Sequence, residues 1–210
     1  MVVIMKNRNI VITLSLVIII SSGCIAKIAG NGTLSNTDLF GKDVYSNKTL
    51  MFEMKLPAGW KSDVMWKLPY GGVVNFVTDK YPWWPSGDSG AIRLDLEQYG
   101  TLSIVQVSMD TQLVPIGYTL GYARSEELKR EEGITYEGET TLGGENAWEI
   151  VRKYRTVGDL YQRDIHVIHG NRLYVLRFQV ISTDAQKRDN VTAELENNFN
   201  GFYSSFRFID

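Results

Sequence analysis

The sequence predicts an α+β domain in which helices pack against an antiparallel sheet. Two observations predict this fold class. Segments with alternating apolar and polar residues, separated by short turn signals, follow one another through the second half of the chain, as in an antiparallel meander. Apolar residues at helical spacing occupy one segment before that meander and another near the C-terminus. Strands, helix, strands and helix in this order are typical of α+β domains.

Residues 1–23 have the features of an export signal. Basic residues precede an apolar run at residues 10–20, which has the length of a signal-peptide core and is shorter than the ~20 residues that cross a bilayer. Small residues at 21–23 then lead to Cys24, the single cysteine of the chain. This boundary resembles the lipobox of lipoproteins, in which the cysteine carries the lipid. We expect cleavage before a lipidated Cys24; the alternative is an uncleaved N-terminal anchor helix.

The rest of the chain divides into a tether and one folded domain. Residues 24–47 are rich in Gly, Asn, Ser and Thr and predict a flexible tether, and residues 48–210 predict the domain. The formal net charge of −2 argues against a nucleic-acid partner, because binding to phosphates needs a basic surface. A chain with one cysteine forms no internal disulfide, so the core must stabilise this domain.

The first half of the predicted domain contains short strands. Leu50, Phe52, Met54 and Leu56 alternate with more polar residues and predict a strand at residues 50–56 that buries one face. Further strands are expected at residues 73–77, 92–96 and 102–107, the last two as a hairpin.

A helix and a meander follow. Residues 116–132 predict an amphipathic helix that begins after Pro115 and ends at Gly133. The strands of the meander are expected at residues 134–142, 147–154, 160–168 and 173–181. In the last strand Tyr174, Leu176, Phe178 and Val180 share one face, opposite Arg177 and Gln179. This alternation indicates a sheet with one buried side.

The C-terminal segment predicts a second helix. Thr183, with Gln186 three residues later, is expected to cap its N-terminus. The apolar residues that follow are expected to pack on the buried side of the sheet: Val191, Leu195, Phe199, Phe202 and Phe206.

Four short segments carry a family resemblance. They are FEMKLPAGW at residues 52–60, TLGGENAWEI at 141–150, YVLRF at 174–178 and SF at 205–206. Together they resemble the PsbP-like proteins over about residues 40–210. The resemblance implies a central antiparallel β-sheet flanked by helices, an α/β/α sandwich. Members of that family include photosystem subunits, a nuclear-import factor and many lipoproteins, so the resemblance implies a binding role.

Two patterns suggest chemistry. Ser89 lies in Gly-Asp-Ser-Gly, the sequence around a protease nucleophile, but it would need a histidine base, and a loop between strands is the favoured interpretation. Asp164 and His166 alternate onto one strand face, with His169 at the following turn, and could begin a metal site. A solvated polar face beside Gln162 explains them as well. We find no phosphate-binding loop or dinucleotide fingerprint and expect no cofactor.

An aromatic, proline-rich segment at residues 79–90 is the candidate contact surface. We assign five rings to this surface: Tyr81, Trp83 and Trp84, and the preceding Trp66 and Tyr70. Trp and Tyr are enriched at binding hot spots, and the neighbouring prolines restrict the backbone. The alternative is that these rings cover one end of the core.

Together these features predict a non-catalytic, membrane-tethered extracytoplasmic module that binds or assembles with a protein partner. Its predicted place is the outer face of the cytoplasmic membrane, held by the lipid on Cys24. The alternative function is a small-molecule- or metal-binding accessory lipoprotein, and a hydrolase that uses Ser89 is a third hypothesis.

Overall fold

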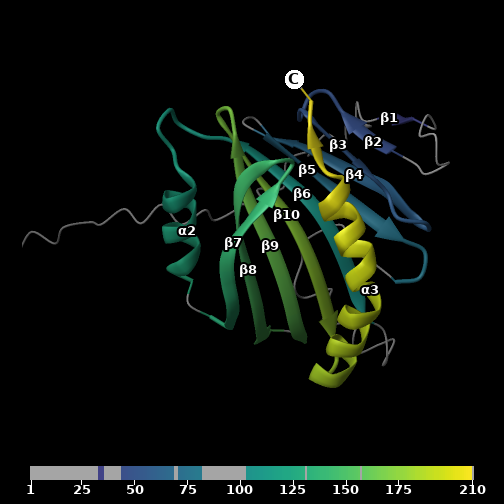
Figure 1. The fold of residues 1–210 in the computed structure, drawn as a ribbon. Helices are drawn as coiled ribbons and strands as arrows, with labels where there is room; N and C mark the ends of the chain where they lie inside the picture. The colour runs from purple at the N-terminus through teal and green to yellow at the C-terminus, as the bar shows by residue number, and fades with distance from the viewer. Residues whose placement is uncertain are drawn as a thin grey trace, which may run out of the picture.

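The computed structural model describes residues 33–35, 44–68, 71–81, 103–130, 132–156 and 158–209. These residues form two antiparallel sheets and two helices (Figure 1). The four-stranded sheet has the order β1-β2-β3-β11, and the seven-stranded sheet has the order β4-β5-β6-β10-β9-β8-β7. The elements are β1 (Thr33–Ser35), β2 (Val44–Asn47), β3 (Phe52–Lys55), β4 (Trp60–Leu68), β5 (Gly71–Thr78), β6 (Ile104–Leu113), α2 (Leu120–Leu128), β7 (Ile134–Leu142), β8 (Glu145–Arg155), β9 (Asp159–His169), β10 (Arg172–Ser182), α3 (Ala185–Ser205) and β11 (Arg207–Phe208).

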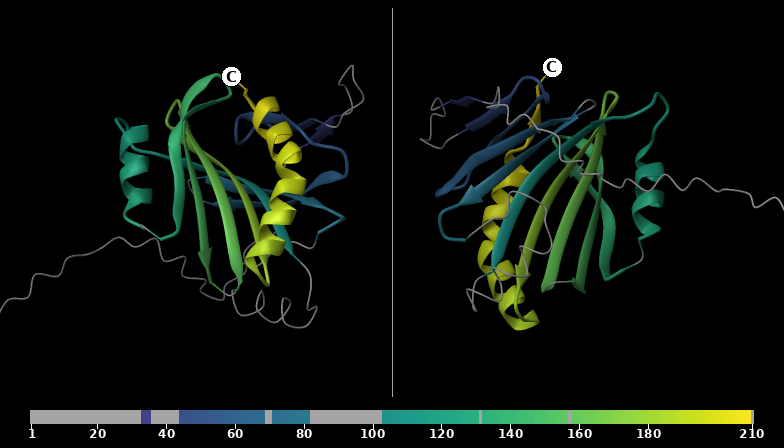
Figure 2. Two further views of the ribbon diagram at one scale, coloured as in Figure 1. Left: turned by 60° about the horizontal axis from the view of Figure 1, so that its bottom comes forward. Right: turned by 180° about the vertical axis from the view of Figure 1, so that it is seen from behind.

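The predicted fold class, a central sheet flanked by helices in an α/β/α sandwich, is wrong. The described residues are mostly strand, and α3 packs between the seven-stranded sheet and a second sheet. The nine-residue α2 contacts β8 and β9 near one end of the large sheet and does not form a layer across it (Figure 2). Of the strands in the second sheet, β3 lies within the expected residues 50–56, whereas β1, β2 and β11 have two to four residues and are too short to show a period of two in the sequence.

The meander is predicted well, because its strands are long and alternate regularly. Strand β7 has the expected bounds, and β8, β9 and β10 extend the expected ranges by one or two residues at each end. Gly143 and Gly144, between β7 and β8, both have positive φ, of 62° and 87°. A two-residue hairpin loop of this kind needs positive φ at both positions, which favours glycine.

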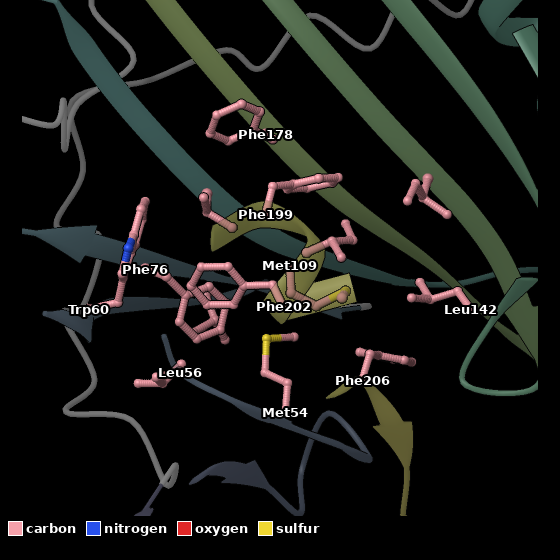
Figure 3. Close-up of a cluster of buried hydrophobic side chains, with 14 of the residues drawn as sticks. Met54, Leu56, Trp60, Phe76, Met109, Leu142, Phe178, Phe199, Phe202 and Phe206 are labelled. Atoms are coloured by element: carbon pink, nitrogen blue, oxygen red, sulfur yellow. The ribbon is translucent and has the colours of Figure 1, made fainter. Parts of the chain in front are cut away.

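The core lies between α3 and the two sheets (Figure 3). The predicted apolar faces are confirmed: Phe52 and Met54 of β3 and Phe178 of β10 are all buried. Phe199 of α3 lies on Phe178, with ring centroids 5.1 Å apart, and Phe202 lies edge-on to Trp60 at 5.2 Å. Phe206 is also buried, as predicted, although α3 ends one residue before it.

Both helices begin at a residue that differs from the prediction. The side chain of Asp184, not Thr183, accepts a hydrogen bond from the backbone N–H of Lys187 at the start of α3. Helix α2 begins after Thr119, whose hydroxyl accepts from the N–H of Tyr122, and the expected first residue, Ile116, is fully exposed. Neither of these described helices is long and apolar enough to cross a membrane.

The predicted tether overlaps the fold at its C-terminal end. Strand β2 lies within residues 24–47 and pairs with β3, and its Tyr45 is buried against Phe52 and Phe76. These residues therefore belong to the core. The first strand of the expected hairpin, at residues 92–96, lies outside the described residues, and β6 contains most of the second.

Candidate functional site

The face of the seven-stranded sheet that points away from α3 carries polar side chains across five strands. On β10, Arg177 alternates with Leu176 and Phe178, which point toward α3. In the register of the sheet, Arg177 of β10 pairs with Asp164 of β9 on one side and with Ser108 of β6 on the other. We call this surface the polar face; its members are Asn75, Gln106, Ser108, Asp110, Arg152, Gln162, Asp164, His166, Arg177 and Gln179.

Much of the polar face is buried, which the sequence did not predict. Asp164 has no exposed surface, and Arg152 and Gln162 are 5% and 9% exposed. The sequence predicted a sheet with one buried side and a solvated polar side. Buried charges are costly unless they are paired and hydrogen-bonded, so the contacts of these side chains decide what this face can do.

Arg177 is the centre of a charge network. Its Nε and Nη2 donate to the two carboxylate oxygens of Asp164, at 2.9 and 3.2 Å, and its Nη1 donates to Asp110 at 3.1 Å. Burial opposes the Arg177 charge, but attraction to Asp164 and Asp110 outweighs it and raises the pKa of the guanidinium. Two carboxylates therefore hold this one arginine in a fixed, ionised state.

Amide side chains complete the network around Asp164. Gln162 Nε2 donates to Asp164 Oδ2 at 2.6 Å, and Gln162 Oε1 accepts from Gln179 at 2.8 Å. Burial favours the neutral carboxyl of Asp164, but Arg177 outweighs burial and lowers its pKa. Asp164 is therefore ionised at neutral pH, so it is poorly suited to act as a general acid or base there.

Arg152 connects the polar face to α2. Its Nη2 donates to the backbone carbonyl of Glu127 at 3.1 Å and to the Glu127 carboxylate at 3.2 Å. The C-terminus of a helix favours a cation, because its last carbonyls have no partner within the helix. Arg152 Nη1 lies 4.0 Å from Asp164, and its buried Nε–H has no partner among the described residues.

These side chains line a cavity of about 470 Å³ between α2 and the sheet. Arg177, Arg152 and Gln162 contribute from the sheet, and Arg130 lies just after α2. The full lining is Glu127, Arg130, Glu132, Arg152, Tyr154, Gln162 and Arg177. A cavity with charged groups held in fixed positions suits the recognition of a small polar molecule.

A second cavity, of about 480 Å³, lies between the start of α2 and strands β7 and β8. The ion pair between Arg124 and Glu137, at 2.8 Å, crosses it, and Trp148 contributes to its wall. The side chains of this pair are 49% and 34% exposed, so neither charge is buried as Asp164 and Arg152 are.

His166 is buried on the polar face beside Trp148, with ring centroids 5.2 Å apart. Neither of its ring nitrogens has a hydrogen-bond partner among the described residues, and burial lowers its pKa. The predicted placement of Asp164, His166 and Gln162 on one face is confirmed by the register. His169 lies elsewhere and stacks on Phe208 of β11 at 4.0 Å. The described residues contain no group of three or more His, Cys, Asp or Glu side chains that could hold a metal ion.

The structure describes part of the predicted contact surface. Tyr81 is partly buried against the core, and its hydroxyl donates to Glu194 of α3 at 2.9 Å. The backbone of Trp66 lies in β4, paired with Val73. Tyr70, Trp83, Trp84 and the two other predicted site residues, Cys24 and Ser89, lie outside the described residues.

Sequence reasoning missed Arg152, Arg177 and Asp110 as site residues. Alternation places Arg177 on the polar side of β10 but does not show that this side is partly buried. The available signal was a charged residue near the middle of each of several long strands. In a wide sheet, the neighbouring strands limit the contact of such a residue with water.

Of the comparisons with known proteins, the one with solved structures finds matches. No family model and no curated protein match the chain. A cyanobacterial PsbP from Synechocystis sp. PCC 6803 is 13% identical, with a TM-score of 0.49, and the match covers 85% of this chain and 98% of that protein. LpqN of Mycobacterium tuberculosis, involved in cell envelope biogenesis, is 14% identical, with a TM-score of 0.42 and coverage of 85% and 91%. A protein of unknown function from Pseudomonas aeruginosa is 8% identical, with a TM-score of 0.40 and coverage of 75% and 90%. Membership of the PsbP-like family stays a prediction.

Proposed function

We propose that this chain is a non-catalytic binding module, exported and tethered to the outer face of the cytoplasmic membrane. Its ligand site in this proposal is the 470 Å³ cavity between α2 and the polar face. The cavity is the single observation that favours small-molecule binding. It supports the alternative function, a small-molecule-binding accessory lipoprotein.

The charges around the cavity favour binding over proton transfer. A general base works best when its pKa lies near the operating pH and it can reach the reacting proton. Here the pKa of Asp164 is lowered, and both of its oxygens accept hydrogen bonds from Arg177. Groups fixed in this way can orient a ligand at little entropic cost, which is what a receptor needs.

Export and tethering rest on the N-terminal sequence. The short apolar run followed by small residues and Cys24 supports cleavage and lipidation at that cysteine. Mass spectrometry of the N-terminal peptide from native membranes tests this step. We expect an acylated Cys24 as the first residue; an unmodified Cys24 inside an intact N-terminal peptide would contradict the tether.

A protein partner at the aromatic segment belongs to the same proposal. The bond from Tyr81 to Glu194 fixes one end of that segment on α3, which supports its use as a defined surface. The test is Trp83→Ala with Trp84→Ala. We expect an unchanged thermal midpoint and the loss of co-purifying proteins; a collapsed midpoint would make these rings structural.

Small-molecule binding is tested on the full chain extracted from its own membranes. The protein is denatured, and the released small molecules are identified by mass spectrometry. Arg130→Gln changes an exposed residue of the cavity, and Arg207→Gln changes an exposed arginine of the other sheet. We expect one molecule to accompany the wild type and Arg207→Gln and to be depleted from Arg130→Gln. The same profile in all three would contradict the proposal.

A further inference from the structure

The two arginines of the polar face differ in how many carboxylates accept hydrogen bonds from them. Arg177 donates to two, Asp164 and Asp110. Arg152 donates to one, Glu127, and its distance of 4.0 Å to Asp164 is too long for a hydrogen bond. Arg152 is also the less exposed of the two, with 6% of its side chain accessible against 27% for Arg177.

The guanidinium of Arg152 therefore has more N–H donors than hydrogen-bond acceptors around it. Its Nε–H is buried without a partner among the described residues. A buried donor without an acceptor destabilises a fold, and this cost is larger for a charged group. Nη1 of the same guanidinium lies 4.0 Å from Asp164, too far for a hydrogen bond, so a ligand in the cavity can supply an acceptor there.

The acidic residues nearby do not fill this role. Asp110 and Asp164 are held by Arg177, and Gln162 takes a further lone pair of Asp164. Glu127 already contacts Arg152, and Glu132 lies with Arg130 in the exposed part of the lining. Of the three arginines in the lining, Arg177 already donates to two carboxylates, which leaves Arg152, buried, and Arg130, exposed, as the basic groups for a further anion.

We infer that the cavity binds a small oxyanion, a carboxylate or phosphate group, through Arg152 and Arg130. The anion would give Arg152 a second hydrogen-bonded acidic partner beside Glu127, as Arg177 has with Asp164 and Asp110. Gln162 and Tyr154 provide further polar contacts in the same lining. Guanidinium groups suit this ligand, since their planar donors match the oxygens of carboxylates and phosphates. This inference rests on the proposed function and names its ligand class.

Titration calorimetry on the full chain tests the inference with inorganic phosphate and, separately, with succinate, at constant ionic strength. We expect saturable binding of at least one anion, and which of them binds distinguishes a phosphate ligand from a carboxylate ligand. Arg130→Gln and Arg152→Lys should each weaken binding about tenfold or more, because each removes charge-assisted donors. Arg207→Gln is the control and should bind as the wild type does.

Three results would overturn the inference. They are no saturable binding of either anion, equal affinity in all variants, and weaker binding by Arg207→Gln to the same extent. Arg130 is exposed, so its variant is expected to fold even if Arg152→Lys does not. An uncharged molecule that co-purifies with the wild type and is lost from Arg130→Gln would refute the oxyanion and leave the proposed function intact.

Discussion

The two faces of the seven-stranded sheet differ in what they bury: one buries apolar rings and the other buries charged side chains. The face toward α3 is apolar, and its rings pack on Phe199 and Phe202 (Figure 3). The other face buries Asp164 and Arg152 and must match each charge with a partner. Apolar burial stabilises a fold without demanding a fixed geometry, whereas buried ion pairs contribute little net stability but fix the positions of their members. The comparison indicates that stability resides mainly on the α3 face and recognition on the polar face.

The largest effect is expected on the apolar face. Phe178→Ala should cost about 3–5 kcal/mol of unfolding free energy, because it empties a fully buried site against Phe199. Urea unfolding measures this value. A loss below ~1 kcal/mol would show that Phe178 does not face the helix, since a one-residue shift in register would place it on the polar face.

On the polar face, Asp164→Ala should cost about 2–4 kcal/mol, because it leaves Arg177 without its main partner. The cost is reduced by the exposed 27% of the Arg177 side chain. The double variant Asp164→Leu with Arg177→Met should recover part of the loss, since apolar groups of similar size replace the ion pair while Asp110 is left without its arginine partner. A double variant as unstable as the sum of both single variants would contradict a coupled pair.

His166 makes the stability of the polar face depend on pH. Its pKa is lowered by burial from the ordinary value of 6.5, so the folded chain resists protonation while the unfolded chain accepts it. Stability should therefore fall as the pH drops below about 6.5, by at most about 1.4 kcal/mol per unit, until the folded pKa is reached. Asp164, whose pKa is lowered from 3.8, loses its contribution only in more acidic solution.

The control for this pH dependence is His166→Gln, which removes the titrating ring. Thermal midpoints of both proteins between pH 7.5 and pH 5, a range about the ordinary histidine pKa, provide the comparison. We expect a flatter profile for the variant over this range. Parallel profiles would show that His166 is solvated in the folded chain.

A smaller effect is expected where α3 begins. Asp184→Ala should cost about 1 kcal/mol, because the backbone N–H of Lys187 loses its capping acceptor. Asp184→Asn keeps an acceptor and should remain close to the wild type. Chemical denaturation of both variants checks the cap; if instead Thr183→Ala carried the loss, the cap would lie one residue earlier.

The smallest effect is expected at the aromatic segment. Tyr81→Phe removes the exposed hydrogen bond to Glu194 and should cost about 0.5 kcal/mol or less. Unfolding measurements should therefore barely separate it from the wild type. A loss above ~2 kcal/mol would show that the segment stabilises the core.

Sequence patterns predicted the apolar face and β3, and missed β1, β2 and β11 of the second sheet. Tyr174, Leu176 and Phe178 alternate over a long strand, and α3 repeats apolar residues every three or four positions, so local periodicity was sufficient. Strand β2 contributes Tyr45 and Asn47 to the interior from only four residues. So short a strand is recognised by its pairing with β3, and this pairing is visible only in the folded structure.

The polar face was missed for a different reason. Alternation shows which side chains share a face but not whether water reaches it. Arg177 and Asp110 are 67 positions apart in the sequence, and Arg152 meets Glu127 through α2. These contacts depend on the order of strands in the sheet, which local patterns do not determine.

The central claim is that Arg177 donates to two carboxylates of the polar face, whereas Arg152 donates to one and binds an oxyanion as its second partner. Nitrogen-15 NMR of the arginine Nε–H groups in the full chain tests it most directly, during titration with phosphate or succinate. The account predicts that the Arg152 signal moves saturably with one of these anions while the signals of Arg177 and Arg207 stay in place. An unmoved Arg152 signal, or equal shifts of all three arginines, would contradict it.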